Sequence, residues 1–166
     1  MVIANAQSDG KGRHGKAFFS PADGGLYMSF LLSPERMGFD DATAITAYAA
    51  VCVCEAVEAA CGIALRIKWV NDLMLNGKKV AGILTEAITE LESGRTTAVV
   101  LGIGINVSTT DFPEEIRDVA TSLFPDGMSR NQLAAEIINR ILQSPVPQRD
   151  EFFTQYNARL LDCHCL

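Results

Sequence analysis

Apolar residues fall into short runs and a few longer stretches along the chain. Leu26–Leu32 predicts a mostly buried strand, because six of its seven residues are aliphatic, aromatic or methionine. Asn76-Gly77 is typical of a tight hairpin turn between two strands. The other predicted strands are short and lie at Val2–Ala4, Arg66–Trp69, Asp72–Leu75, Lys79–Glu86 and Thr97–Ile105.

Three longer segments predict helices. The first begins at a cap provided by Asp40 or Asp41 and ends near Cys61, where Gly62 can adopt the left-handed conformation. The other two run from Ser129 to about Leu142 and from Asp150 to about Leu161, with a break between them at Pro145 and Pro147. Clustered strands with a few helices indicate an α+β fold, in which helices pack on a mixed or antiparallel sheet.

The composition is that of one globular domain. The 166 residues are 48% hydrophobic and 20% charged, which suits a single packed core. With 14 Lys and Arg against 20 Asp and Glu, the net charge is −6, so nucleic acid is not an expected partner. The most apolar stretch, Ala44–Leu65, is interrupted by Glu55 and Glu58, and the N-terminus lacks a signal-peptide pattern. We therefore expect a cytoplasmic protein that does not enter a membrane.

The five cysteines are expected to be reduced thiols. Their odd number and their spacing do not fit a disulfide framework. Cys52 and Cys54 lie two residues apart in the predicted helix and therefore point to different faces of it. Zinc needs about four ligands, so metal binding by the cysteines, including the tail Cys163-His164-Cys165, is not favoured.

A glycine-rich, basic loop extends from Gly10 to Lys16. Its sequence, Gly-Lys-Gly-Arg-His-Gly-Lys, matches both the dinucleotide-binding pattern and the phosphate-loop pattern. Both patterns need a helix directly afterwards, and Pro21 with Gly24-Gly25 excludes a long helix there. The loop is therefore either a different kind of anion-binding loop or a solvated surface loop. Its mobile backbone carries three cations, Lys11, Arg13 and Lys16.

Three further polar segments lie beside the apolar strands, at Lys68–Leu73, Lys78–Leu84 and Gly102–Val107. In the same order, the biotin protein ligases carry a loop of the form Gln-x-x-Gly-Arg-Gly-Arg-x-Gly-Arg, then Lys-Trp-Pro-Asn-Asp, Lys-x-(Ala/Gly)-Gly-Ile-Leu and Gly-x-Gly-(Ile/Leu)-Asn. The chain therefore resembles the catalytic domain of this family from about Val2 to Leu161. The corresponding stretches are Gln7–Lys16, Lys68–Asp72, Lys79–Leu84 and Gly102–Asn106.

The resemblance implies a fold, an activity and partners. The family's catalytic domain has a fold like that of the class II aminoacyl-tRNA synthetases. Biotin–[acetyl-CoA-carboxylase] ligases use ATP and Mg²⁺ to convert biotin to biotinyl-5′-adenylate, and then transfer biotin to a lysine of a biotin carboxyl carrier protein domain. We expect this activity here. Two alternatives stay open: a catalytically impaired remnant or binding module of the same fold, and a relative of the lipoate–protein ligases.

The resemblance also implies roles for individual residues. Lys79 and Arg13 are the expected catalytic cations, because they would stabilise charge on the biotin carboxylate and the α-phosphate. Asp72 is the expected metal ligand. We expect the loop to be disordered without ligand and to close over the adenylate. The expected biotin-binding residues are Gln7, Gly10, Lys11, Gly12, Arg13, Lys79 and Gly82. The expected ATP- and adenylate-binding residues are Lys16, Phe18, Lys68, Asn71 and Asn106.

Several positions depart from the family pattern. Lys11 and Lys16 stand where the family has arginine, and Val70 stands where it has proline. Phe18 replaces a tryptophan that packs on adenine, so it is expected either to stack on the base or to fill the core. Trp69 is expected to be a core residue, as aromatic strand residues commonly are.

The resemblance further implies that residues 1–166 form an incomplete catalytic domain. In the family, a Ser/Thr-containing segment that contacts biotin precedes the strand equivalent to Val2–Ala4, and a small β-barrel domain follows the last helix. We therefore expect a chain truncated at both ends and without the N-terminal DNA-binding domain of some relatives. A strand edge exposed in this way would allow a homodimer.

Overall fold

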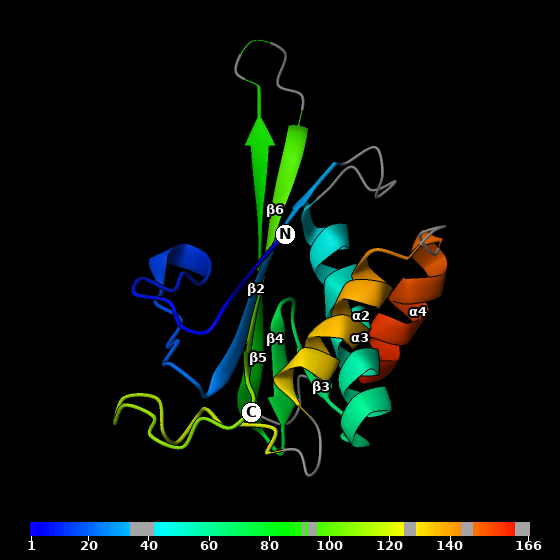
Figure 1. Cartoon of the computed structure of the whole chain (residues 1–166). Coiled ribbons are helices and arrows are strands. Elements are labelled where there is room, and N and C mark those ends of the chain that lie inside the picture. Colours follow the sequence, from blue (N-terminus) through cyan, green and yellow to red (C-terminus); the bar gives the residue numbers. More distant parts are fainter. Residues whose placement is uncertain (34–41, 91, 93–95, 125–128, 144–147, 162–166) are drawn as a thin grey trace.

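The structure, a computed structural model, describes residues 1–33, 42–90, 92, 96–124, 129–143 and 148–161. Its centre is an antiparallel sheet of six strands in the order β1-β2-β6-β5-β4-β3. Among the described residues, three α-helices pack on one face of this sheet, and the N-terminal segment lies over the other face (Figure 1). The α+β fold predicted from the sequence is confirmed.

Every predicted strand is present, although three are longer than expected and one, at Arg66–Lys68, is one residue shorter. The long strands β5 and β6 form a hairpin that extends beyond the rest of the sheet (Figure 1). At the turn between β4 and β5, Asn76 and Gly77 have φ angles of 50° and 79°, as the predicted hairpin requires. The strands are β1 (Val2–Ala4), β2 (Gly25–Leu32), β3 (Arg66–Lys68), β4 (Asp72–Leu75), β5 (Lys78–Thr89) and β6 (Thr96–Asn106).

Alternation along the strands gives the sheet a core face and an open face. In β2, Leu26, Met28 and Phe30 are buried against the helices, and Tyr27 and Ser29 therefore point to the open face. At one edge of the sheet, β1 pairs with β2 on one side only. Homodimer formation through this free edge stays a prediction.

Helix α2 (Ala42–Cys61) forms the centre of the core. It lies between the sheet and the other two helices, and most of its side chains are buried. Contrary to the expectation from the sequence, α2 is long and apolar enough to cross a membrane by length and composition, but it is mostly buried, as the core helix of a folded domain is. It ends at Gly62, whose φ is +69°, as predicted. The predicted caps Asp40 and Asp41 lie outside the described residues.

The two shorter helices begin at side-chain caps. Ser129 caps α3 (Arg130–Ile141) as predicted, since its hydroxyl accepts the N–H of Gln132 while the Gln132 side chain accepts the N–H of Ser129. The predicted start of α4 (Arg149–Arg159) at Asp150 was wrong. The helix begins after Gln148, whose N–H donates to Glu151 at 3.1 Å, so that both acidic residues fall in the first turn.

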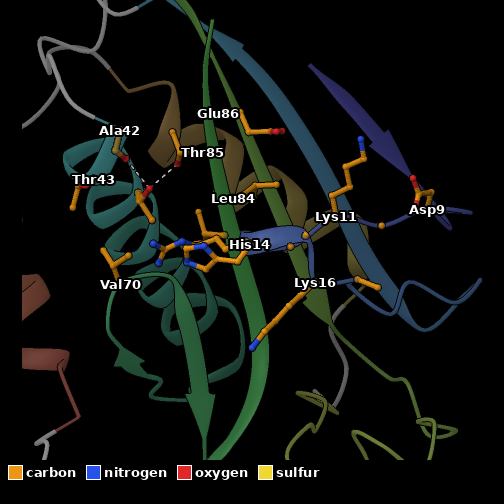
Figure 2. Close-up of a pocket in the computed structure, with 17 residues that line it drawn as sticks. Asp9, Lys11, His14, Lys16, Ala42, Thr43, Val70, Leu84, Thr85 and Glu86 are labelled. Atoms are coloured by element: carbon orange, nitrogen blue, oxygen red, sulfur yellow. Dashed lines mark hydrogen bonds between the residues drawn. The ribbon is translucent and has the colours of Figure 1, made fainter.

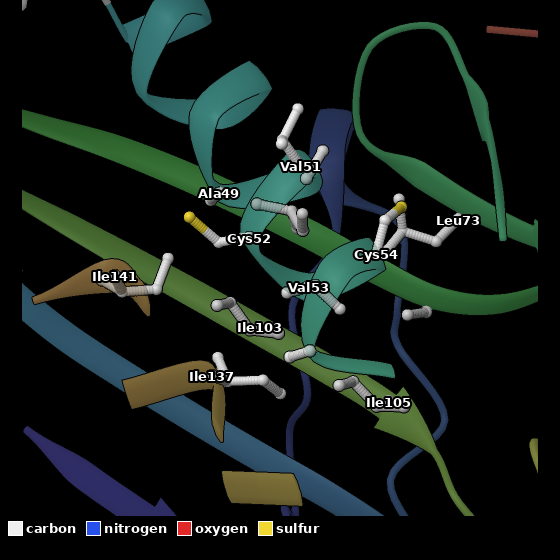
Figure 3. Close-up of a cluster of buried hydrophobic side chains, with 14 of the residues drawn as sticks. Ala49, Val51, Cys52, Val53, Cys54, Leu73, Ile103, Ile105, Ile137 and Ile141 are labelled. Atoms are coloured by element: carbon white, nitrogen blue, oxygen red, sulfur yellow. The ribbon is translucent and has the colours of Figure 1, made fainter. Parts of the chain in front are cut away.

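Buried thiols make the protein sensitive to alkaline pH. Cys52 and Cys54 are free cysteines in the core (Figure 3), where burial raises the pKa of each thiol to about 12. An exposed thiol has a pKa of about 9, so above that pH the unfolded state loses protons that the folded state keeps. Between about pH 9 and 12, each thiol is expected to lower the free energy of unfolding by up to about 1.4 kcal/mol per pH unit, with no such loss below pH 9.

Urea unfolding at pH 8, 9.5 and 10.5 measures this dependence. The variant Cys52→Ala/Cys54→Ala should lose stability less steeply over the same range. Burial also raises the pKa values of Tyr48 and Tyr156, and Cys52 and Cys54 add to these rises, so the contribution of the tyrosines to the pH dependence also becomes smaller in the variant. Parallel pH profiles for the two proteins would show that the thiols do not titrate in this way.

Candidate active site

The N-terminal segment encloses a cavity against the open face of the sheet. The cavity has a volume of about 230 Å³, and its walls are the glycine-rich loop on one side and strands β2, β5 and β6 on the other. The structure therefore brings the basic loop and Lys79 together at one hollow. The expected site residues that line it are Gln7, Lys11, Gly12, Arg13, Phe18, Asn71, Lys79 and Gly82.

Backbone hydrogen bonds close the glycine-rich loop into a small hairpin. The N–H of Phe18 donates to the carbonyl of Gly10 at 2.7 Å, and the N–H of Gly12 donates to the carbonyl of Lys16 at 2.7 Å. At the tip, Arg13–Gly15 forms a single 3₁₀ turn, which the sequence did not predict. The three cations of the loop are thus held on a compact, exposed turn above the sheet.

Ser20 fixes the base of this loop, and sequence reasoning missed it. Its hydroxyl accepts a hydrogen bond from the Gln7 side-chain amide at 2.8 Å and donates to the carbonyl of Phe18 at 2.9 Å. Gly10 fits between these groups only because it has no side chain, since a Cβ there would lie 2.3 Å from the carbonyl oxygen of Phe18. The expected disorder of the loop without ligand stays a prediction.

Lys79 projects from the start of β5 over the open face. Its Nζ lies 2.6 Å from Oδ1 of Asp72 on the neighbouring strand β4, and 5.7 Å from the ring centroid of Phe18. Both members of the Lys79–Asp72 ion pair are half-buried. The expected metal ligand Asp72 therefore has the expected catalytic lysine as its ion-pair partner.

The chain after β6 holds the backbone of Lys79, which no sequence pattern indicated. The N–H of Lys79 donates to the carbonyl of Val119 at 2.8 Å, and its carbonyl accepts the N–H of Thr121 at 2.9 Å. The Thr121 carbonyl also accepts Nδ2 of Asn106 at 3.0 Å. A single residue, Thr121, thus joins the strand of the lysine to the expected adenylate-binding amide.

Asn106 carries a buried acceptor that none of the described residues uses. Its side chain is 5% exposed, and its Nδ2 is occupied by Thr121. Its Oδ1 is buried and has no hydrogen-bond partner within the described part of the chain. A buried acceptor without a partner is costly, so this oxygen is suited to accept an N–H from a ligand. Asn106 itself is not among the residues that line the cavity.

Asn71 connects the loop to the sheet. Its Nδ2 donates to the carbonyl of Ile83 at 3.0 Å, and its own carbonyl accepts the N–H of Ile83 at 2.9 Å. Its Oδ1 accepts a hydrogen bond from Nη1 of Arg13 at 3.2 Å. The expected nucleotide-binding residue Asn71 is therefore placed to orient the guanidinium of Arg13 toward the cavity.

Three glycines form the floor of the cavity, at Gly82, Gly102 and Gly104. Phe18 lies directly on this floor, because a Cβ at position 104 would approach its ring to 2.6 Å. The ring also meets Tyr27 edge to face, with 6.5 Å between centroids. Phe18 is half-buried and faces the cavity, so it is not a residue of the main hydrophobic core.

Two glycine substitutions in the cavity floor are expected to differ in their effect on the free energy of unfolding. Gly104→Ala is expected to lower the free energy of unfolding by about 1 to 3 kcal/mol, because the new methyl group would overlap the ring of Phe18. In Gly102→Ala, the nearest atoms of Leu84 lie 3.6 and 3.8 Å away, so little loss is expected. Urea unfolding of both variants measures the difference, and equal losses would contradict the packing of Phe18 on Gly104.

A second, wider hollow lies beside the loop, next to the start of α2. Its volume is about 590 Å³, and Figure 2 shows Lys11, His14 and Lys16 on its loop side. A hydrogen bond of 2.7 Å between the hydroxyls of Thr46 and Thr85 joins α2 to β5 at its inner wall. Lys16 and the exposed His14 thus reach this hollow, whereas Lys79 lines the smaller cavity.

Two residues of the Lys-Trp-Val-Asn-Asp segment lie away from the cavity. Lys68 is exposed at the end of β3 and lines neither of the two hollows, so the structure does not bring it to the other expected site residues. The expectation that Trp69 is a core residue was wrong, because its side chain is 66% exposed. The ring packs edge to face on Tyr156 of α4, at 6.1 Å, and leaves its other side to solvent.

Asp72 is the residue beside the cavity that is expected to hold Mg²⁺. Among the described residues there is no group of three His, Cys, Asp or Glu side chains that could hold a metal ion. Mg²⁺ in nucleotide sites is commonly bound by one or two carboxylates together with substrate phosphates. Asp72, half-buried beside the cavity, fits such a role when phosphates are present.

Comparison with known proteins shows the family to which the chain belongs. A profile of the Biotin/lipoate A/B protein ligase family matches residues 1–106. The bifunctional ligase/repressor BirA of Bacillus subtilis is 41% identical over an alignment of 142 positions, which covers 84% of this chain and 41% of that protein. The biotin–[acetyl-CoA-carboxylase] ligase of Mycobacterium tuberculosis is 28% identical over an alignment of 170 positions, which covers 97% of this chain and 60% of that protein. The chain thus spans about two fifths to three fifths of the length of these relatives.

Solved structures of biotin protein ligases are also similar to this chain. The biotin protein ligase of Aquifex aeolicus in complex with biotin and ATP superposes with a TM-score of 0.79 and 32% identity, over 96% of this chain and 67% of that one. The biotin protein ligase of Leishmania major in complex with biotinyl-5-AMP has a TM-score of 0.75 and, at 20% identity, supports the fold alone. The chain therefore belongs to the biotin/lipoate A/B protein ligase family, with the fold of a biotin protein ligase catalytic domain.

Proposed function

We propose that this chain is a biotin protein ligase, which uses ATP to convert biotin to biotinyl-5′-adenylate and transfers biotin to a lysine of a carrier domain. The observation that carries the proposal is the cavity shared by Arg13 and Lys79 over a floor of glycines. The relative from Aquifex aeolicus binds both biotin and ATP, as its structure records. Because ATP is the proposed substrate and the described cysteines are free, we also propose a cytoplasmic location.

The first step requires one anion to attack another. An oxygen of the biotin carboxylate attacks the α-phosphorus of ATP, the bond to the bridging oxygen breaks, and pyrophosphate leaves with that electron pair. Fixed cations at the point where charge accumulates lower the barrier for such a step. Lys79 and Arg13 face the same cavity and supply two positive charges there. Mg²⁺, held by Asp72 and the phosphates, would neutralise part of the phosphate charge.

Lys79 has Asp72 as its partner before the substrates bind and would have others afterwards. In the ligand-free site the ammonium group lies against Asp72. When a carboxylate and a phosphate enter the cavity, the ammonium group can move to them and leave the Asp72 carboxylate to the metal. We therefore propose that the Lys79–Asp72 pair separates on binding of ATP and biotin.

The remaining residues divide between the two substrates. Phe18 offers an aromatic face beside Lys79, and the unused acceptor of Asn106 suits the exocyclic amine of adenine. The loop lysines Lys11 and Lys16, which lie on either side of the loop tip, suit the phosphates as point charges. For biotin, the proposed contacts are the Gln7 side chain, the backbone from Gly10 to Gly12, and the cavity floor at Gly82.

In the second step the carrier domain provides the nucleophile. The neutral amine of its lysine attacks the acyl carbon of the adenylate, the bond to the phosphate oxygen breaks, and AMP leaves as the amine loses a proton to solvent. The loop would shield the adenylate from water before the carrier arrives. The product is an amide between biotin and the carrier lysine.

Biotin-dependent exchange of radiolabelled pyrophosphate into ATP tests the first step, and biotin transfer to a purified carrier domain tests the second. We expect both, with exchange absent when biotin is omitted. Binding of biotin without either reaction would favour the noncatalytic alternative. Exchange that depends on lipoate instead of biotin would assign the chain to the other branch of the family.

A further inference from the structure

Helix α4 reaches the candidate site through one buried tyrosine. The side chain of Tyr156 is completely buried, and its hydroxyl donates a hydrogen bond of 3.0 Å to the carbonyl of Val70. Val70 lies in the turn between β3 and β4, and its carbonyl belongs to the peptide unit that ends in the nitrogen of Asn71. The tyrosine therefore fixes the backbone directly before the residue that contacts Arg13.

Contacts continue from this peptide to the basic loop. Asn71 makes two hydrogen bonds to Ile83 of β5, and its Oδ1 accepts from Arg13 at 3.2 Å. Arg13 lines the cavity together with Lys79. An unbroken series of contacts thus runs from Tyr156 through Val70 and Asn71 to the guanidinium of Arg13.

The tyrosine is itself held firmly in place. Its ring meets Trp69 and Phe153 edge to face, each at 6.1 Å between centroids. After α4 the chain pairs with β3, where the N–H of Leu161 donates to the carbonyl of Ile67 at 2.9 Å. Burial raises the pKa of Tyr156 to about 12, so the hydroxyl keeps its proton and acts as a donor at neutral pH.

We propose that Tyr156 is a positioning residue for adenylate formation, which sets the place of Arg13 over the cavity through Val70 and Asn71. This inference rests on the proposed function. The tyrosine touches no reacting atom. Its contribution is to reduce the freedom of a cation that must be in place when the two substrates meet, and small displacements of such groups are costly to the rate.

The variant Tyr156→Phe removes only the hydroxyl and keeps the ring. We expect a three- to tenfold loss in the turnover number for pyrophosphate exchange. In the background of Asn71→Ala, where the contact with Arg13 is already lost, Tyr156→Phe should cause no further loss. A purely structural role would instead give losses that multiply in the double variant, and this would overturn the proposal.

Tyr48→Phe is the matched control. Tyr48 is also a buried tyrosine whose hydroxyl donates to a backbone carbonyl, that of Arg140, at 2.8 Å, but it lies in α2 and lines neither hollow. Its loss of thermal stability should resemble that of Tyr156→Phe, and its exchange rate should equal that of the wild type. Equal exchange rates for the two variants would overturn the proposal.

A second measurement separates this inference from the proposed function. If the wild type gives no exchange, the proposed function fails, and the positioning of Arg13 is then read from tryptic cleavage after Arg13 in the ligand-free protein. Asn71→Ala and Tyr156→Phe should each raise the rate of this cleavage about threefold, with no change in Tyr48→Phe. Unchanged cleavage in Tyr156→Phe would overturn the inference by itself.

Discussion

Lys79→Ala is expected to lower the rate of biotin-dependent pyrophosphate exchange by about 100- to 1,000-fold, the usual effect of removing one preorganised group that stabilises transition-state charge. Lys79 is suited to this role because the backbone on both sides of it is held by Val119 and Thr121, and its ammonium group lies over the cavity. The loss should fall mainly on the turnover number, since the charge that Lys79 stabilises develops during the attack on phosphorus.

Two controls accompany this variant. Lys78→Ala removes the neighbouring lysine, whose Nζ donates to the carbonyl of Arg117 outside the cavity, and should leave exchange unchanged. Lys79→Ala also leaves the carboxylate of Asp72 without its ion-pair partner. We expect no recovery of activity in the double variant Lys79→Ala/Asp72→Asn, because Asp72 is also the proposed Mg²⁺ ligand. Recovery of activity in the double variant, or equal losses for Lys78 and Lys79, would refute a catalytic role for Lys79.

Local sequence signals predicted most of the fold. The turn at Asn76-Gly77, the stop at Gly62 and the cap at Ser129 each depend on the chemistry of one or two residues, and each is where the sequence placed it. The start of α4 was misplaced because Gln148, a less common cap, is followed by Glu151 and competes with Asp150. The lengths of β5 and β6 depend on pairing with each other, which a local pattern does not contain.

The candidate site was only partly predictable for the same reason. Arg13 and Lys79 lie in recognisable segments, so the sequence could suggest that they act together. The groups that hold them in place are ordinary residues far along the chain: Thr121 binds the backbone of Lys79, and Tyr156 reaches Asn71 through a backbone carbonyl. A serine at position 20 or a tyrosine in an amphipathic helix carries no sign of such a role until the fold brings it there.

Gly10→Ala is expected to reduce kcat/KM for biotin by about 100-fold, comparable to the effect of moving a binding group by about 1 Å. The glycine is buried, and a Cβ on it would lie 2.3 Å from the carbonyl oxygen of Phe18 and 2.6 Å from the hydroxyl of Ser20. Neither group can retreat easily, because the hydroxyl donates to that same carbonyl and the N–H of Phe18 donates to Gly10. The loop must therefore reopen at its base, and its cations leave the cavity. The thermal midpoint should change by only a few degrees, since the loop lies on the face of the sheet opposite the core.

Gly15→Ala is the control for this prediction, because it is the same substitution at another position of the same loop. Gly15 lies at the tip of the same loop with a φ of +72°, but within the described residues no atom beyond its two chain neighbours lies within 4 Å of a Cβ placed there. The only cost is the left-handed backbone, about 1 kcal/mol for a residue with a side chain, so the loss in kcat/KM should stay below about tenfold. Steady-state exchange kinetics at varied biotin concentration compare the two variants. If Gly15→Ala lowered kcat/KM for biotin as much as Gly10→Ala does, the losses would be due to the general flexibility of the loop. The prediction, which rests on the closed base formed by Gly10, Phe18 and Ser20, would then be wrong.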